Sequence, residues 1–228
     1  MSTKEKIIKH RRKLNLIFRT VGNTFIILAI FFLAMGFWPY IGSEFRYNWN
    51  QLVGQRYAVA GDPIQAAGSP LGAIVTAPAP ISITPVNTEF SIIIPKIDVN
   101  SPIVQEVDAG NYNDYIAALK KGVAHARGTV FPGQDGNSFI FAHSSLNFWD
   151  QARYNAVFML LRKLEVGDQI VTYYHGQRYD YYVTDKVVVE ANDVRYLTPS
   201  AEGRQLTLQT CDPPGINLRR LIVVAKAR

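Results

Sequence analysis

The sequence predicts a mainly β protein, in which a closed barrel of eight short strands with a few short helices follows one transmembrane helix. Two observations carry this prediction. Residues 88–228 hold about eight short runs rich in β-branched and aromatic residues, with few helical patterns between them, and such spacing favours a closed or nearly closed barrel. Residues 21–42 are 22 uncharged, mostly apolar residues, long enough to cross a hydrocarbon core of about 30 Å.

The N-terminal region is interpreted as a membrane anchor preceded by a basic cytoplasmic tail, residues 1–20. The tail holds seven Lys and Arg residues against one Glu, which accounts for the whole net charge of +6. The remainder is neutral, so the charge does not indicate a nucleic-acid partner. The positive-inside rule places the tail in the cytoplasm and residues 43–228 outside the cell membrane. A cleaved signal peptide would have a shorter apolar region and a small-x-small cleavage site, so we favour an uncleaved single-pass anchor.

Residues 43–87 are predicted to be a linker rich in Pro, Gly and Ala. Such composition is typical of an extended spacer that lifts a domain away from a membrane. The part before Gly61 is more apolar, with Tyr47, Trp49 and Leu52. It either packs, as a short helix, or stays extended, and both alternatives are open.

The elements expected in residues 88–228 follow in chain order. Strands are predicted at Phe90–Pro95, Ile97–Val99, Ile103–Val107, Ser138–Ala142, Gln169–Tyr174, Tyr179–Val189, Gln205–Thr210 and Leu221–Ala225. Helices are predicted at Tyr112–Leu119 and Tyr154–Leu164, because their apolar residues recur at helical spacing. The glycine-flanked segment around His125 is expected to be a loop.

Cys211 is the only cysteine, so the chain has no internal disulfide. It directly follows the predicted strand Gln205–Thr210 and precedes Asp-Pro-Pro-Gly, which ends the strand because proline cannot donate to a sheet ladder. The thiol is therefore expected at a rigid strand end, beside a turn. A lone cysteine is more often an inert buried residue than a nucleophile, so its role depends on its neighbours.

A nucleophilic thiol needs an acid or base nearby, and histidine is the usual one. His143 follows an apolar strand directly, as Cys211 does, and we favour it as the partner over His125. His175 falls in a predicted hairpin turn, and His10 lies in the cytoplasmic tail.

Attack of a thiolate on a carbonyl creates an oxyanion, which needs a hydrogen-bond donor. Arg219 and Arg220 precede the last predicted strand and are the candidates, although solvated strand-end charges are commoner. A metal site is not indicated, because His125 and His143 lack the companion spacing of zinc ligands.

Three blocks of this sequence resemble the sortases, which are membrane-anchored cysteine transpeptidases of bacteria. Residues 207–211 read Thr-Leu-Gln-Thr-Cys and match every specified position of the family signature Thr-Leu-x-Thr-Cys. Residues 122–143 resemble the family segment that leads into its catalytic histidine, and residues 211–223 resemble family endings in which an arginine precedes an apolar strand. The resemblance covers residues 88–228 and implies that they form a catalytic domain with the sortase barrel.

The resemblance implies the roles of the site residues. Cys211 resembles the nucleophile and His143 the acid/base. Arg220 resembles the family arginine, with Arg219 as the alternate. Ala142 stands where the family usually has glycine, and the following segment is longer than usual, which leaves the subclass and the substrate pocket open.

The implied function is cleavage of a sorting signal resembling Leu-Pro-x-Thr-Gly in surface proteins, through a thioester. The acyl group would pass to an amine of a peptidoglycan precursor or of a pilin lysine. Thr207, Thr210 and Ser144 are expected to contact the substrate. No cofactor is expected; some sortases use calcium, but the loop carboxylates here offer no specific pattern. A membrane-anchored cysteine protease and a non-catalytic, tethered β-barrel binding module are the alternatives.

Overall fold

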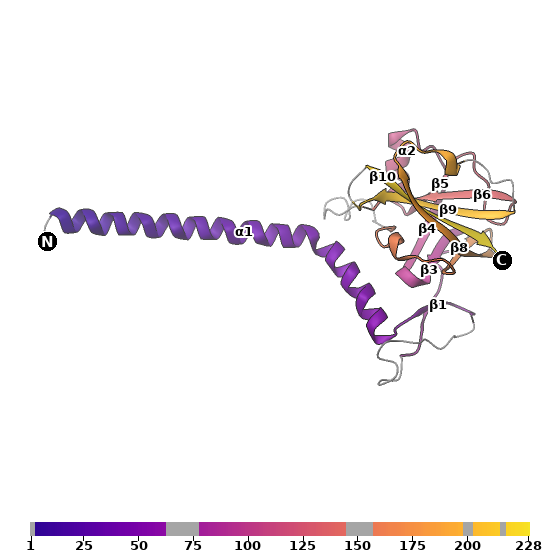
Figure 1. Cartoon of the computed structure of the whole chain (residues 1–228), viewed down its shortest axis with the longest axis horizontal. Helices are drawn as coiled ribbons and strands as arrows, with labels where there is room; N and C mark the ends of the chain where they lie inside the picture. The colour runs from indigo at the N-terminus through magenta and orange to yellow at the C-terminus, as the bar shows by residue number, and fades with distance from the viewer. Residues whose placement is uncertain (1–2, 63–77, 145–156, 198–202, 215–217) are drawn as a thin grey trace.

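Eight strands close into a barrel in the order β10-β8-β7-β3-β4-β5-β6-β9, and β9 pairs with β10 to complete it. This computed structural model describes residues 3–62, 78–144, 157–197, 203–214 and 218–228 (Figure 1). The closed eight-stranded barrel and the apolar N-terminal helix confirm the predicted fold class. The barrel strands are β3 (Phe90–Ile94), β4 (Val99–Val107), β5 (Val123–Ala126), β6 (Gly136–Phe141), β7 (Gln169–Tyr174), β8 (Gln177–Glu190), β9 (Arg204–Asp212) and β10 (Arg219–Ala227).

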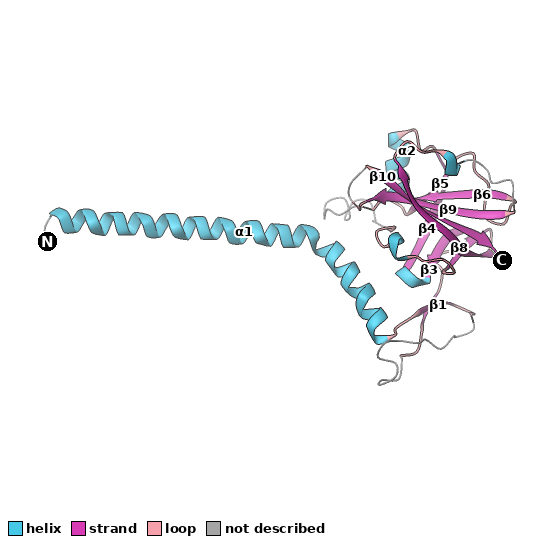
Figure 2. Ribbon diagram, viewed as in Figure 1, coloured by secondary structure: helices cyan, strands magenta, loops and turns pink. Residues whose placement is uncertain are grey.

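Helical segments are few, as the secondary-structure colouring shows (Figure 2). The α-helices are α1 (Thr3–Val53) and α2 (Tyr112–Leu119), and the short 3₁₀ helices are η1 (Pro95–Ile97), η2 (Leu161–Lys163) and η3 (Arg195–Leu197). The predicted helix at Tyr112–Leu119 is confirmed. Its first turn is capped by the Asn111 side chain, which accepts hydrogen bonds from the amides of Asn113 and Asp114.

Two local predictions are corrected. The segment around His125 is strand β5, not a loop, because Val123, Ala124 and Ala126 are buried between the neighbouring strands β4 and β6. The runs predicted separately as Ile97–Val99 and Ile103–Val107 are also not two strands. Strand β4 is continuous from Val99 to Val107, and the 3₁₀ helix η1 precedes it.

The predicted helix Tyr154–Leu164 is also corrected, as far as its described residues show. Residues 157–160 form a turn and η2 follows, whereas residues 154–156 lie outside the described parts. Phe158, Leu161 and Leu164 are completely buried in the main core. They are three residues apart, which is the period of a 3₁₀ helix, so one tight turn brings all three into the barrel.

The first part of α1 contains a candidate membrane span. The span runs from His10 to Trp38 and none of its most apolar window is buried inside the protein. This span overlaps the predicted segment 21–42, whose bounds stay a prediction. The helix bends after this long first part, and its last part runs beside the barrel (Figure 1). Pro39 follows the span, and a proline within a helix removes one backbone hydrogen bond and favours a kink.

Residues 41–53 of α1, called the juxtamembrane helix below, dock on the barrel. The Glu44 carboxylate forms ion pairs with Arg162 and with Lys163, the latter at 2.9 Å. Tyr47 packs against the main core cluster, and the Lys163 ammonium lies 5.1 Å from the centre of its ring. This part of the predicted linker is therefore packed helix.

The far end of the predicted linker is also attached to the barrel. Strand β1 (Tyr57–Val59) pairs in parallel with β2 (Ile81–Ile83). The buried side chains of Val59 and Ile83 pack on Ile93 and Val171 of the barrel wall. Between the two strands, residues 63–77 lie outside the described parts.

Candidate active site

The candidate site lies where three neighbouring strands, β6, β9 and β10, end or begin. Strand β6 runs parallel to β9, with Phe141 opposite Gln209. Strand β10 runs antiparallel to β9, with Arg220 directly opposite Cys211. The C-terminal ends of β6 and β9 and the start of β10 therefore meet at one end of the barrel.

Hydrogen bonds continue the β6–β9 register past the end of β6. The Ala142 amide donates to the Gln209 carbonyl at 3.1 Å, and the Ser144 hydroxyl donates to the Cys211 carbonyl at 2.7 Å. His143 lies between these two contacts and is therefore beside Cys211. Neighbouring strands are about 4.8 Å apart, and residues that lie opposite each other point to the same face.

That face is the outer face of the barrel wall. Leu206 and Leu208 of β9 are completely buried in the main core. Because side chains alternate along a strand, Cys211 points away from that core. The structure thus brings Cys211, His143 and Arg220 together on one surface.

The surroundings of Cys211 have two opposing effects on the pKa of its thiol. Cys211 is half-buried, and this burial raises the pKa of its thiol above the ordinary value. The positive charge of Arg220 lowers that pKa, which partly offsets the effect of burial. An ionised Cys211 therefore depends on a nearby positive charge.

Arg219 takes a different position. It lies opposite Asp212, and its guanidinium is 3.9 Å from the Asp212 carboxylate. Successive residues of a strand point to opposite faces, so Arg219 and Arg220 cannot both extend over the thiol. The register thus favours Arg220 as the arginine beside the Cys211 thiol, although the two arginines are adjacent in the sequence.

A further residue, Tyr115 of α2, contacts the histidine and was not anticipated from the sequence. Its ring stacks on Phe141 at 5.5 Å and meets the His143 ring edge-to-face at 5.2 Å. Its hydroxyl oxygen lies 3.4 Å from His143 Nδ1. The helical spacing of residues 112–119 predicted α2, but nothing in that pattern shows which side chain reaches His143.

The hydroxyl of Tyr115 keeps its proton at neutral pH. Burial, together with the charge of an ionised Cys211, raises the pKa of Tyr115 to about 12. The protonated phenol can donate to an unprotonated His143 Nδ1 or accept from a protonated one. In either case the contact orients the imidazole ring.

The three residues expected to contact substrate have other partners. The Thr207 hydroxyl donates to the Asn137 side chain at 2.8 Å, and the Thr210 hydroxyl donates to the Ala142 carbonyl at 2.9 Å. Together with Ser144, which binds the Cys211 carbonyl, they are at most 4% exposed. Their hydroxyls join the end of β6 and the residues after it to β9 and so help to hold the site together, whereas their contact with substrate stays a prediction.

The other histidines of the barrel lie elsewhere. His125 is completely buried, stacked on Phe131 at 4.7 Å, and its Nε2 lies 3.1 Å from the Val130 carbonyl. Burial lowers its pKa, so it is a neutral core residue. His175 lies between β7 and β8, with Nδ1 2.6 Å from the Glu89 carboxylate. Neither is placed beside Cys211.

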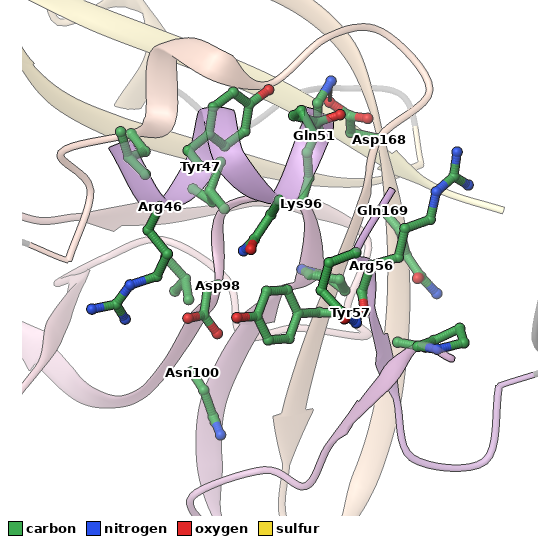
Figure 3. Close-up of a pocket in the computed structure, with 18 of the residues that line it drawn as sticks. Arg46, Tyr47, Gln51, Arg56, Tyr57, Lys96, Asp98, Asn100, Asp168 and Gln169 are labelled. Carbon is green, nitrogen blue, oxygen red and sulfur yellow. Dashed lines mark hydrogen bonds and ion pairs between the residues drawn. The ribbon is translucent and has the colours of Figure 1, made fainter. Parts of the chain in front are cut away.

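Other polar regions of the molecule do not contribute to this site. Within the described ranges, no group of three His, Cys, Asp or Glu side chains is arranged to hold a metal ion. A cleft of about 1570 Å³ separates the juxtamembrane helix from the barrel (Figure 3), but Cys211, His143 and Arg220 do not line it.

Comparisons with known proteins identify the family to which the barrel domain is similar. A sortase-domain family model matches residues 92–228. The curated sortase D of Bacillus subtilis (strain 168) is 28% identical over 120 residues, which are 53% of this chain and 52% of that protein. The match thus spans about half of that relative's length.

Solved structures of sortases share the fold. A sortase D5 transpeptidase of Clostridium perfringens superposes with a TM-score of 0.51 and 26% identity, covering 62% of this chain and 79% of that one. Sortase A from Corynebacterium diphtheriae superposes with a TM-score of 0.52 and 31% identity, covering 62% of this chain and 61% of that one. The two TM-scores are nearly equal, so they do not distinguish the sortase D5 type from the sortase A type.

Proposed function

The chain belongs to the sortase family, whose domain model matches residues 92–228 of its 228 residues, and on this premise we propose that it is a membrane-anchored cysteine transpeptidase. The observation that carries the proposal is that Cys211 lies opposite Arg220 of β10 and beside His143, which follows the end of β6 between two residues hydrogen-bonded to β9. These positions supply a nucleophile, an oxyanion donor and an acid/base on one surface.

In the first half-reaction, the Cys211 thiolate attacks the carbonyl carbon of a Thr–Gly-like bond in the sorting signal. The carbonyl electrons move onto oxygen, and the Arg220 guanidinium stabilises this oxyanion. When the tetrahedral intermediate collapses, the C–N bond breaks and the protonated His143 gives its proton to the departing amine. The products are a thioester on Cys211 and a free amine.

In the second half-reaction, an incoming amine attacks the thioester carbonyl. The neutral His143 takes a proton from that amine, and the Cys211 thiolate leaves as the new amide forms. Water can replace the amine, which gives hydrolysis. Tyr115 positions the His143 ring in both halves.

The cellular setting follows from the anchor. We propose that the basic tail is cytoplasmic and that the barrel lies outside the cell, in accordance with the positive-inside rule. The substrates would be surface proteins that carry a sorting signal, and the amine would come from a peptidoglycan precursor or a pilin lysine. Both partner assignments rest on family membership.

The test uses the full chain in detergent with a fluorogenic sorting-signal peptide. Cys211→Ala should abolish cleavage, and His143→Ala should reduce it strongly. His175→Ala is the matched control, because His175 is a histidine on an exposed turn, and it should keep wild-type activity. Cleavage at the wild-type rate by Cys211→Ala would overturn the proposal.

Product analysis separates transfer from hydrolysis. With wild-type enzyme, mass spectrometry should detect a thioester on Cys211 and, after addition of an oligoglycine or a lysine-bearing pilin peptide, the new amide. A cysteine protease would give only the hydrolysed peptide at every amine concentration. A non-catalytic binding module would give neither the thioester nor any product.

A further inference from the structure

The juxtamembrane helix has two chemically different faces. The face that lines the cleft is mainly polar and includes Ser43, Arg46, Tyr47, Asn50 and Gln51; Figure 3 labels three of these residues around the cleft. Glu44, beside this face, pairs with Arg162 and Lys163 of the barrel. This face of the helix therefore faces the barrel.

The opposite face carries an exposed apolar stripe. It consists of Ile41, Phe45, Trp49 and Leu52, which are 51%, 67%, 53% and 44% exposed and do not line the cleft. Their spacing of four, four and three residues places them along one side of a helix. The rings of Phe45 and Trp49 stack at 6.1 Å with an interplanar angle of 16°.

The stripe cannot reach the barrel core without undocking the helix. Tyr47 packs against the main core cluster, so the face roughly half a turn away must point outward. A contiguous row of exposed aromatic and aliphatic side chains usually marks an interaction surface. The stripe therefore needs a covering partner.

The membrane is the partner that the surroundings favour. The stripe belongs to the same helix as the candidate span, which ends at Trp38. At 1.5 Å per residue, a straight continuation would carry Leu52 about 20 Å beyond Trp38, whereas the headgroup region is only about 5–8 Å thick. The bend of α1 turns this part sideways instead, with the barrel on one side of it (Figure 1).

We propose that the juxtamembrane helix lies in the membrane interface, with Ile41, Phe45, Trp49 and Leu52 inserted between the lipids and the barrel docked on its other face. An amphipathic helix with Trp, Phe and Leu on its apolar side binds lipid in this way. The proposal rests on the anchoring proposed above. Its consequence is that the barrel is held at a set orientation on the membrane surface, not on a free spacer.

The test reads the depth of Trp49 in the full chain reconstituted in phosphatidylglycerol–phosphatidylcholine bilayers. Trp38→Phe and Trp149→Phe leave Trp49 as the only tryptophan. Lipids brominated in the upper acyl chain should quench its emission strongly, because such helices insert about 5–10 Å into the headgroup–acyl boundary. Aqueous acrylamide should quench it weakly.

The matched control replaces all three tryptophans by phenylalanine and adds Tyr112→Trp. Tyr112 is 73% exposed on α2, which lies on a different side of the barrel from the juxtamembrane helix (Figure 1). Its emission should respond to acrylamide and not to brominated lipid.

Two outcomes for Trp49 would overturn the proposal. Strong quenching by acrylamide alone would mean that the stripe faces water. Protection from both quenchers would mean that protein covers it, as in a contact with a second copy of the chain. Fluorescence does not depend on catalysis, so failure here is distinguishable from failure of the proposed transpeptidase activity.

Discussion

The barrel wall that carries the candidate site and the juxtamembrane helix that docks on the barrel are held by different forces. Around the site, backbone ladders join β6, β9 and β10 over a core in which Ile140, Leu208 and Val223 are completely buried. The juxtamembrane helix is held by the ion pairs of Glu44 with two cationic partners, whose side chains are up to a third exposed, and by the packing of Tyr47 on the core.

This difference predicts that the barrel around the site is more rigid than the docked juxtamembrane helix. Each fully buried aliphatic side chain contributes about 1.5–3 kcal/mol, whereas an exposed ion pair contributes about 0–1 kcal/mol. The geometry around Cys211 should therefore persist under changes of pH and salt that loosen the helix. Four predictions test this contrast, beginning with the largest expected effect.

Truncating a buried core side chain beneath the site should lower the free energy of unfolding more than any other change. Leu208→Ala deletes a completely buried side chain in β9, three residues before Cys211. We expect the free energy of unfolding to fall by about 2–5 kcal/mol, because a cavity is left in the barrel. Chemical denaturation followed by circular dichroism measures it, and Leu218→Ala, which removes a 68% exposed side chain, is the control. Equal losses for both variants would refute the contrast.

Removing the charge opposite the thiol should affect catalysis instead of stability. Arg220→Ala should reduce kcat/KM by about 100- to 1000-fold, the usual loss for one oxyanion donor. It should also raise the pKa of Cys211, because Arg220 lowers it in the native site. Alkylation of Cys211 by iodoacetamide should then reach its half-maximal rate at a higher pH.

Arg219→Ala is the matched control for that experiment. Arg219 lies opposite Asp212, so both the alkylation profile and the activity should stay close to wild type. If Arg219→Ala had the larger effect on either measurement, the assignment of Arg220 would be wrong.

Breaking the helix contact should have the smallest effect. Glu44→Gln should weaken docking by about 0.5–1 kcal/mol while leaving the barrel intact. Spin labels at Asn48→Cys and Lys226→Cys, in a Cys211→Ala background, should show a broader distance distribution. Glu165→Gln is the control, because Glu165 pairs with Lys96 within the barrel region. An unchanged distribution for Glu44→Gln would show that the ion pairs do not hold the helix.

The same contact should respond to acid. Burial raises the pKa of Glu44, but hydrogen bonds and charge from Lys163 and Arg162 outweigh it and lower the pKa overall. A carboxylate with a lowered pKa stabilises docking above its ordinary value of about 4.3, and this contribution is lost as the pH falls through the lowered pKa. The label distances should therefore broaden in acid before the barrel unfolds.

Much of the barrel could be predicted because its strands carry local signals. Leu206 and Leu208 alternate with polar residues in β9, and α2 has a helical pattern that the structure confirms. Strand β5 was missed because four residues, including a histidine, have no clear period. Residues 157–164 were assigned to a helix because the apolar spacing of a 3₁₀ turn and of an α-helix is similar over so short a segment.

The sequence by itself determined the barrel class and the apolar N-terminal helix, and its resemblance to the sortases predicts Cys211 as the nucleophile and His143 as the acid/base. Each depends on one residue type or on a pattern within one segment. The resemblance favoured Arg220 with Arg219 as the alternate, and only the tertiary structure adds a physical reason, since neighbouring residues of a strand face opposite ways and the β9–β10 register places Arg220 opposite Cys211. The Tyr115 contact with His143 and the docking of the juxtamembrane helix likewise join segments far apart in the chain, and no local pattern encodes such contacts.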